Sequence, residues 1–390
     1  MKIKIGIVGK LFIAMFIGVG FGYCGPDWLI RGLNSFGGTF GQFIKFFVPF
    51  IIIGLVTPAI AETGKGAGRL LLATMCVAYA STLFAGGFAY TMANFTFPKI
   101  LTVSLVDTVK VTEFPAYFVL RIPALMDVTT ALVVAFVFGL SMVALDLPQL
   151  KNTFNEIREA VTLTIKKALL PLLPVYILAV IADLTASGKL AVVGGGCIKI
   201  MALAFAVTTA ILIIQYLIAG IVSGRNPLKL IWNMLPAYLT GWGCCSSAAT
   251  LPVTLRQTKK NEVSDKVTDL VIPLCANVHL AGSMANMVVY TAGFIVLAGG
   301  NLSLAQYIPF MLMLSVIAVA SPGVPGGVVL ASYGIACTAL GFDEKSYALV
   351  TAAYMALDGM GTACNLTGDG AIAVMMDRFF GDKKQKFSKS

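Results

Sequence analysis

Apolar residues fill long segments along the chain, and the charged residues gather between them. Eight segments reach the roughly 20 residues that an α-helix needs to cross a bilayer. They span about 6–24, 37–60, 68–95, 123–146, 163–184, 195–223, 267–297 and 345–376. The pattern predicts an all-α polytopic membrane protein with eight transmembrane helices.

Two further stretches, about 226–257 and 302–340, have apolar arms on both sides of a tip of small residues. Non-helical backbone at membrane depth is tolerated only where it is buried in protein or lines a cavity. Paired interrupted segments of this kind are typical of transporters built from inverted repeats. We therefore predict two re-entrant helical hairpins, because two ordinary loops would leave the apolar arms unexplained.

The positive charges agree with an even number of crossings. With a cytoplasmic N-terminus, alternation puts most of the 28 lysines and arginines on the cytoplasmic side, including those of the tail 381–390. Such an excess marks cytoplasmic loops, so both termini are expected in the cytoplasm. The run 6–24 has no small-residue cleavage site behind it, which predicts a spanning helix rather than a signal peptide.

Composition narrows the class of protein. The 390 residues are 58% apolar and only 12% charged, which excludes a soluble domain. The net charge of +10 comes from residues at segment ends, so it gives no reason to expect a nucleic-acid partner. The eight cysteines are scattered and support neither a zinc site nor a disulfide framework. No cofactor is predicted.

The last span carries polar side chains on one helical face. Asp358, Thr362, Asn365 and Asp369 follow one another at intervals of four, three and four residues, which aligns them on a helix. A carboxylate at the bilayer centre costs at least about 2.5–3.5 kcal/mol and normally faces a cavity, an ion or a partner. The face therefore predicts a binding site, although a packed helix with satisfied polar groups stays open. The glycines beside Asp369 are expected to loosen the helix and offer carbonyls to a cation.

The span 267–297 is also polar at its centre, at Asn277, His279 and Ser283. His279 is the only histidine of the chain. A lone buried histidine is more often a satisfied hydrogen-bonding group than a proton carrier, but imidazole titrates near physiological pH. Both interpretations stay open.

These motifs together resemble the dicarboxylate/amino acid:cation symporter family, which has the glutamate-transporter-like fold. The resemblance covers about 225–380 strongly and the earlier residues only through the order of segments. Four ordered motifs carry it: Ser246-Ser247 with Thr250-Leu251-Pro252-Val253-Thr254, then Ile272-Pro273-Leu274, Gly323-Val324-Pro325-Gly326, and Asp358 to Asp369.

The resemblance implies a homotrimer that works as an elevator. Residues 1–66 and 97–190 would form a scaffold, and residues 67–96 and 191–380 a mobile transport domain. Asp358 would receive the substrate amine, and Thr362 and Asn365 would contact its carboxylate region. The other substrate contacts would come from Ser246, Ser247, Ser283, Gly323, Val324, Pro325 and Gly361.

The resemblance also implies sodium sites made of oxygen ligands, which hard cations prefer. One would combine Asp369 with the carbonyls of Cys275, His279 and Asn365. A second would use carbonyls near Asn277, Ala318, Val319 and Ser321.

Three positions depart from the family pattern and bear on the substrate and the coupling ions. Carriers of acidic amino acids have an arginine at the position of Gly361 or of Cys245, and without it a buried substrate carboxylate would stay unpaired. A neutral substrate is therefore expected. The Ser283 hydroxyl suits serine or threonine, and Gly361 leaves room for a larger substrate side chain.

Ala281 replaces an aspartate of a third sodium site, which predicts fewer coupled sodium ions. Some neutral serine/threonine carriers share this alanine.

The sequence thus predicts a secondary active symporter in the cell membrane that couples sodium to uptake of a serine-, threonine- or alanine-like substrate. The alternative within the class is an acidic amino-acid or dicarboxylate symporter, with or without proton coupling. An intramembrane enzyme would need Asp358 and Asp369 as an acid/base pair, yet eleven helical residues separate them by about 16 Å. A passive channel would leave the two hairpins unexplained.

Overall fold

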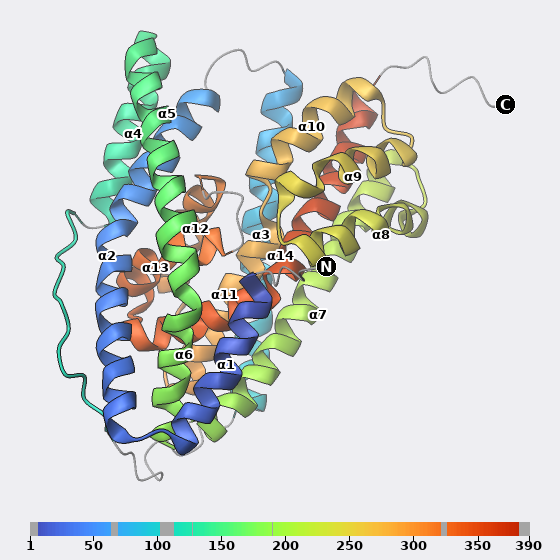
Figure 1. Ribbon diagram of the computed structural model, residues 1–390. Coiled ribbons are helices and arrows are strands. Elements are labelled where there is room, and N and C mark those ends of the chain that lie inside the picture. Colours follow the sequence, from blue (N-terminus) through green and yellow to red (C-terminus); the bar gives the residue numbers. More distant parts are fainter. Residues whose placement is uncertain are drawn as a thin grey trace, which may run out of the picture.

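The computed structural model describes residues 7–63, 69–101, 113–126, 128–188, 190–320 and 326–381. All regular secondary structure in these ranges is helical (Figure 1). Five helical spans among them are long and apolar enough to cross a membrane: Asp27–Pro58, Arg69–Ile100, Pro148–Ala186, Gly195–Ser223 and Asp265–Leu297. The described chain therefore has the build of a multi-pass membrane protein.

A first group of helices comes from the N-terminal half and stands at the left of Figure 1. In it α2 packs against α4, α5 and α6, and α1 packs against α6. A π-helical turn at Ile165–Leu169 joins α5 to α6 without a break. The bounds are α1 Ile7–Cys24, α2 Asp27–Thr63, α4 Val128–Leu145, α5 Pro148–Thr164 and α6 Leu170–Ala186.

The second group surrounds two buried helices, α11 (Ala281–Leu297) and α14 (Glu344–Phe380). α11 packs against α3 (Arg69–Ile100) and α7 (Leu190–Ser223), and α14 packs against α7 and α11. Because α3 comes from between the helices of the first group, the two groups interleave along the chain.

Both mixed stretches of the sequence form pairs of packed helices. The pair α8 (Pro227–Cys244) and α9 (Ser247–Lys260) turns at Cys245, whose φ of 51° is left-handed. α12 (Leu304–Ala320) packs against α13 (Gly327–Leu340). The small-residue tip of the first stretch therefore lies at a helix reversal, as the sequence predicts, whereas residues 321–325 of the second tip lie outside the described residues.

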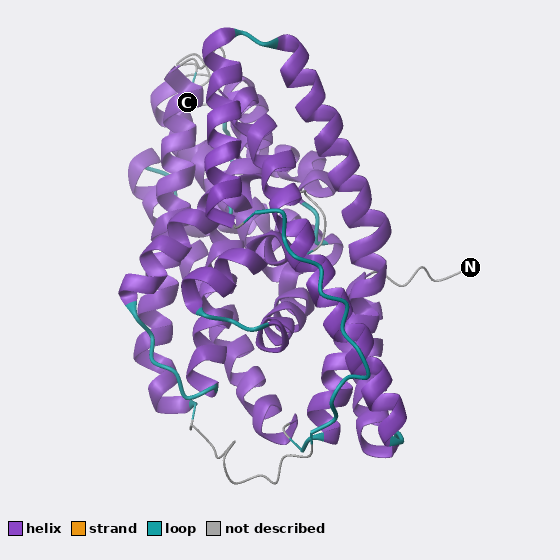
Figure 2. Cartoon of the chain, turned by 90° about the vertical axis from the view of Figure 1, so that its left-hand side faces the viewer, coloured by secondary structure: helices purple, strands orange, loops and turns teal. Residues whose placement is uncertain are grey.

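α2 is longer than its apolar run, because it begins at Asp27 rather than near residue 37. Its polar first turns bind an extended segment, 113–126, that runs alongside the helix (Figure 2). Arg31 Nε donates to the Pro115 carbonyl at 3.1 Å, and Ser35 Oγ accepts from the Tyr117 amide at 2.8 Å. These side chains satisfy backbone groups that no sheet partner would reach.

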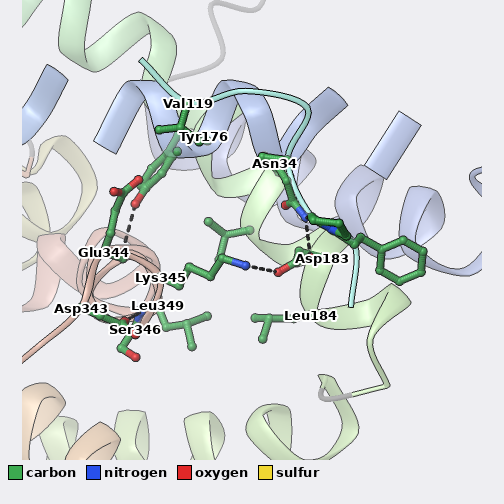
Figure 3. Close-up of a pocket in the computed structure, with 17 residues that line it drawn as sticks. Asn34, Val119, Tyr176, Asp183, Leu184, Asp343, Glu344, Lys345, Ser346 and Leu349 are labelled. Carbon is green, nitrogen blue, oxygen red and sulfur yellow. Dashed lines mark hydrogen bonds and ion pairs between the residues drawn. The ribbon is translucent and has the colours of Figure 1, made fainter. Parts of the chain in front are cut away.

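A cavity of about 660 Å³ lies between the two groups. It is walled by α2, α6, part of the extended segment and the first turn of α14 (Figure 3). Asp183 on α6 is the centre of its polar contacts, since it accepts from Asn34 Nδ2 at 2.6 Å and pairs with Lys345 Nζ at 3.0 Å. On the same wall the Tyr176 hydroxyl donates to the Glu344 carbonyl at 3.2 Å.

At the other end of α14, Arg225 ties three parts of the second group together. Its guanidinium donates to the Asn261 and Glu262 carbonyls and pairs with Asp377 at 3.1 Å. The other oxygen of Asp377 accepts from the Ser264 amide at 3.0 Å. This single side chain therefore fixes the α9–α10 connection on the end of α14.

We expect Arg225→Ala to lower the free energy of unfolding by about 1–2 kcal/mol, since it leaves two carbonyls and a carboxylate less well bonded. Thermal unfolding of the detergent-solubilised protein measures this. Arg256→Ala removes an exposed arginine of α9 and should change the midpoint far less. Equal midpoints for the two variants would contradict the role given to Arg225.

Candidate functional site

Two helices of the second group are interrupted side by side. α10 (Asp265–Val278) ends at His279, whose backbone is extended (φ −95°, ψ 102°), and α11 begins at Ala281. α14 has one non-helical residue, Leu357 (φ −119°, ψ 16°), immediately before Asp358. Both helices pack against each other, so their irregular backbone is buried in protein, as membrane depth requires.

The break in α14 is not where the sequence predicts it. The glycine-rich stretch around Asp369 stays helical. Its glycines instead permit close packing: a Cβ on Gly368 would lie 2.5 Å from Gln215 Oε1 and 2.6 Å from His279 Cε1. The expectation that these glycines loosen the helix was therefore wrong.

Asp358 is almost completely buried and is only 5% exposed. Its Oδ2 accepts a hydrogen bond from the Gly326 amide at 2.8 Å. Gly326 has a left-handed φ of 73° at the start of α13, a conformation that glycine adopts without strain. No lysine or arginine in the described part of the chain forms an ion pair with Asp358.

Asn365 links α14 to the first turn of α11. Its Oδ1 accepts from the amides of Gly282 at 2.7 Å and Ser283 at 3.3 Å, and its Nδ2 donates to Ser283 Oγ at 2.9 Å. All these groups are buried. The side chain therefore satisfies helix N-terminal amides that would otherwise lack a partner.

Asp369 faces the break between α10 and α11. Its Oδ1 lies 2.9 Å from His279 Nδ1, and both side chains are fully buried. His279 Nε2 lies 3.0 Å from Ser81 Oγ and 3.2 Å from Gln215 Nε2. The ring is thus hydrogen-bonded through both nitrogens, which fits a neutral imidazole that donates from Nδ1 and accepts at Nε2.

Sequence reasoning missed Ser81 of α3 and Gln215 of α7. Each is a polar residue inside an apolar span, and that signal alone marks candidates for function. The pattern does not show which residues they contact, because these contacts join residues 64 or more positions apart.

The expected cation ligands are partly brought together. Asp369 Oδ2 is buried and has no hydrogen-bond partner among the described residues, so one carboxylate oxygen is free to bind an ion. The Cys275 carbonyl accepts from the His279 amide at 2.8 Å, and carbonyl oxygens have a second lone pair.

The residues expected at the second cation position lie at two helix ends. α10 and α12 contact each other, with Ala318 buried and Val319 half-buried near the end of α12. The Asn277 side chain is exposed and donates back to the Pro273 carbonyl at 3.1 Å. Ser321 lies outside the described residues, as do Gly323, Val324 and Pro325.

The tip of the α8–α9 pair packs against α14 at Gly359, the residue that follows Asp358. A Cβ on Gly359 would overlap the Trp242 carbonyl and lie 3.1 Å from Cys245 Sγ. Ser246 and Ser247 follow directly and are half-buried. The tip therefore lies beside Asp358, and Thr362 is buried one turn further along α14.

The space beside Gly361 is occupied. A Cβ on Gly361 would lie 2.9 Å from Asn286 Nδ2 of α11. The amide of Asn286 therefore lies where a side chain at position 361 would begin, and the room that Gly361 leaves for a larger substrate stays a prediction. Asn286 was not predicted as a site residue, although it follows Ser283 by three residues on the same helix.

Comparison with known proteins identifies the family to which this chain belongs. The model of the sodium:dicarboxylate symporter family matches residues 7–379, nearly the whole chain. The chain belongs to this family. It is a membrane transport protein of the symporter class rather than an enzyme.

Curated relatives of this symporter carry a more specific name. A serine/threonine transporter SstT of Acinetobacter baumannii (strain AYE) is 24% identical over 392 residues, covering 96% of this chain and 97% of the relative. A serine/threonine transporter SstT of Streptococcus suis (strain 05ZYH33) is 23% identical over 339 residues, covering 84% and 93%.

The contact between His279 and Asp369 gives a stability prediction for the symporter. His279→Ala leaves a buried carboxylate without its hydrogen-bond donor, and loss of a hydrogen bond to a charged group costs about 1.5–3 kcal/mol. We expect a lower thermal unfolding midpoint in sodium-free buffer. Ser81→Ala keeps the contact and is the matched control, so the contact has no such role if both variants unfold at the same temperature.

Proposed function

We propose that the protein couples entry of sodium to uptake of a neutral amino acid across the cell membrane. The observation that carries the proposal is the environment of Asp358. This buried carboxylate has one oxygen on the Gly326 amide and no lysine or arginine beside it in the described chain. It suits an ammonium group and would repel a substrate that is only anionic.

Two helix N-termini support binding of the substrate carboxylate. α9 and α13 begin at Ser247 and Gly327, and both helices contact α14. The N-terminal end of a helix carries a partial positive charge and free amides, which favour anions. An amino acid offers both charges: its ammonium to Asp358 and its carboxylate to these ends.

The C-terminal ends of two helices support binding of sodium. α10 and α12 contact each other and end at Val278 and Ala320, and helix C-termini carry unpaired carbonyls and partial negative charge. Asp369 adds a carboxylate with a free oxygen. Such a set of oxygen ligands at interrupted helices supports sodium as the coupling ion.

The relatives named as serine/threonine transporters support a neutral substrate. The site itself agrees, because Gly361 and Cys245 supply no guanidinium for a second substrate carboxylate. Ala281, which is fully buried, supplies no carboxylate for a third sodium ion. We therefore propose serine, threonine or alanine as substrate, with fewer sodium ions than the full family motif would bind.

We also propose that the second helix group moves as an elevator within a homotrimer whose scaffold is the first group. Support comes from the contacts that join the two groups at the start of α14, which are polar. Glu344 is bonded to Gln42 of α2 at 3.4 Å, and Lys345 pairs with Asp183 of α6 at 3.0 Å. Such side-chain contacts can break and re-form as one group slides along the other.

Asp358→Asn is expected to abolish sodium-driven uptake of serine in proteoliposomes, because a neutral amide no longer pairs with the ammonium. Asp343→Asn, at the N-cap of α14, is the matched control and should retain uptake. Serine uptake by Asp358→Asn at the wild-type rate would refute the assigned role. Preference of the unchanged protein for aspartate or succinate would instead support the acidic-substrate alternative.

The elevator proposal predicts that Lys345 and Asp183 separate during transport. With the native cysteines replaced, a short thiol cross-linker across Asp183→Cys and Lys345→Cys should block uptake reversibly. Asn34 also contacts Asp183, but both residues belong to the first group. Cross-linking Asn34→Cys to Asp183→Cys should therefore leave uptake intact, and undiminished uptake with the first pair joined would exclude the motion.

A further inference from the structure

Asn286 is a fully buried amide on α11, with 0% of its surface exposed. Neither its Oδ1 nor its Nδ2 has a hydrogen-bond partner among the described residues. Leaving a buried polar group unpaired costs about 1–3 kcal/mol. A native protein keeps such a group where a ligand, a water molecule or an ion completes it.

The position of this amide connects it to the substrate site. Nδ2 lies 2.9 Å from where a Cβ of Gly361 would be, and Gly361 stands between Asp358 and Thr362 on α14. On its own helix Asn286 lies three residues after Ser283, so the two side chains share a face. Ser283 Oγ is engaged by Asn365. The Asn286 amide and the Tyr290 hydroxyl, four residues further on, have no hydrogen-bond partner among the described residues, and of the two it is the amide that lies beside Gly361.

The chemistry of a carboxamide restricts what can complete it. It offers two N–H donors and one carbonyl acceptor and carries no charge. A hydroxyl both donates and accepts, so it can pair with this amide in either sense. A carboxylate on the substrate side chain would have no cation beside it in this buried site, so its desolvation would not be compensated. A methyl group on the substrate would leave both polar atoms of the amide unpaired.

The position of the amide bears on the length of the ligand group. Because the Asn286 amide lies beside Gly361, a short side chain on an amino acid held by Asp358 is long enough to reach it. A short side chain that ends in a hydroxyl fits both the distance and the hydrogen bonding.

We propose that Asn286 is the residue that recognises the substrate side chain, and that it selects serine or threonine over apolar amino acids of equal size. This inference rests on the proposed function, since it takes amino-acid symport as given, and it adds a specificity residue and a narrower substrate class. Asn286 acts by direct contact with the substrate hydroxyl.

Threonine and valine test the proposal because they have nearly the same shape and differ in the hydroxyl. In proteoliposomes with an inward sodium gradient, the unchanged protein should take up threonine at least about tenfold more efficiently than valine, as sites built to bond a hydroxyl do. Asn286→Leu keeps the volume and removes the polar atoms, so the ratio should fall toward one. Its sodium dependence should stay unchanged.

Thr291→Val is the matched control, since Thr291 is buried on the same helix and its hydroxyl bonds to the Met287 carbonyl and Tyr307. It should keep the threonine preference. Asn286→Ser provides a smaller replacement if the leucine variant does not fold, which the thermal unfolding midpoint reports. The serine variant should also lower the ratio.

The outcomes separate the two proposals. Absence of any sodium-driven amino-acid uptake by the unchanged protein would overturn the proposed function and this inference with it. Sodium-driven uptake with no preference for threonine over valine would overturn this inference alone. A strong preference that survives in the folded Asn286 variants would show that another residue recognises the hydroxyl.

Discussion

Helix ends that lie inside a membrane protein must find their hydrogen bonds within the protein, because no water reaches them there. The second helix group depends on this constraint. α9 begins at Ser247, α11 at Ala281 and α13 at Gly327, and the first amides of each helix need acceptors that a continuous helix would supply itself. Buried side chains of α14 provide several of them: Asn365 bonds two amides of α11, and Asp358 bonds the first amide of the α13 turn. The polar face of α14 is thus a structural requirement before it is a binding surface.

Much of this architecture could be predicted from the sequence because the interruptions leave a local signature. Small residues between apolar arms mark the α8–α9 and α12–α13 reversals, and polar residues inside an apolar span mark the break at His279. Helix boundaries were less predictable where a helix continues beyond its apolar residues. α2 extends to Asp27 because its polar turns bind a distant extended segment, and no local pattern carries that information.

The contents of the site were predictable only in part, for a related reason. Asp358, Asn365 and Asp369 stand out as polar residues at helical spacing. Ser81, Gln215 and Asn286 are equally polar, but their importance comes from what they meet in space. The glycines of α14 show the same limit, since Gly368 makes room for His279 and Gln215 rather than bending the helix. Sequence identifies which residues are unusual, and packing decides what each one touches.

Asp358 has two oxygen atoms with separate engagements. Oδ2 accepts a hydrogen bond from the amide of Gly326, at the tip of the α12–α13 pair, and Oδ1 is the oxygen that the proposed function assigns to the substrate amine. A carboxylate shares its charge between both oxygens, so a cation arriving at one weakens the hydrogen bond accepted by the other. In the proposed function, binding of the substrate amine would therefore weaken the hydrogen bond that holds the start of α13. Substrate binding and the position of the α12–α13 pair would be linked through this one side chain.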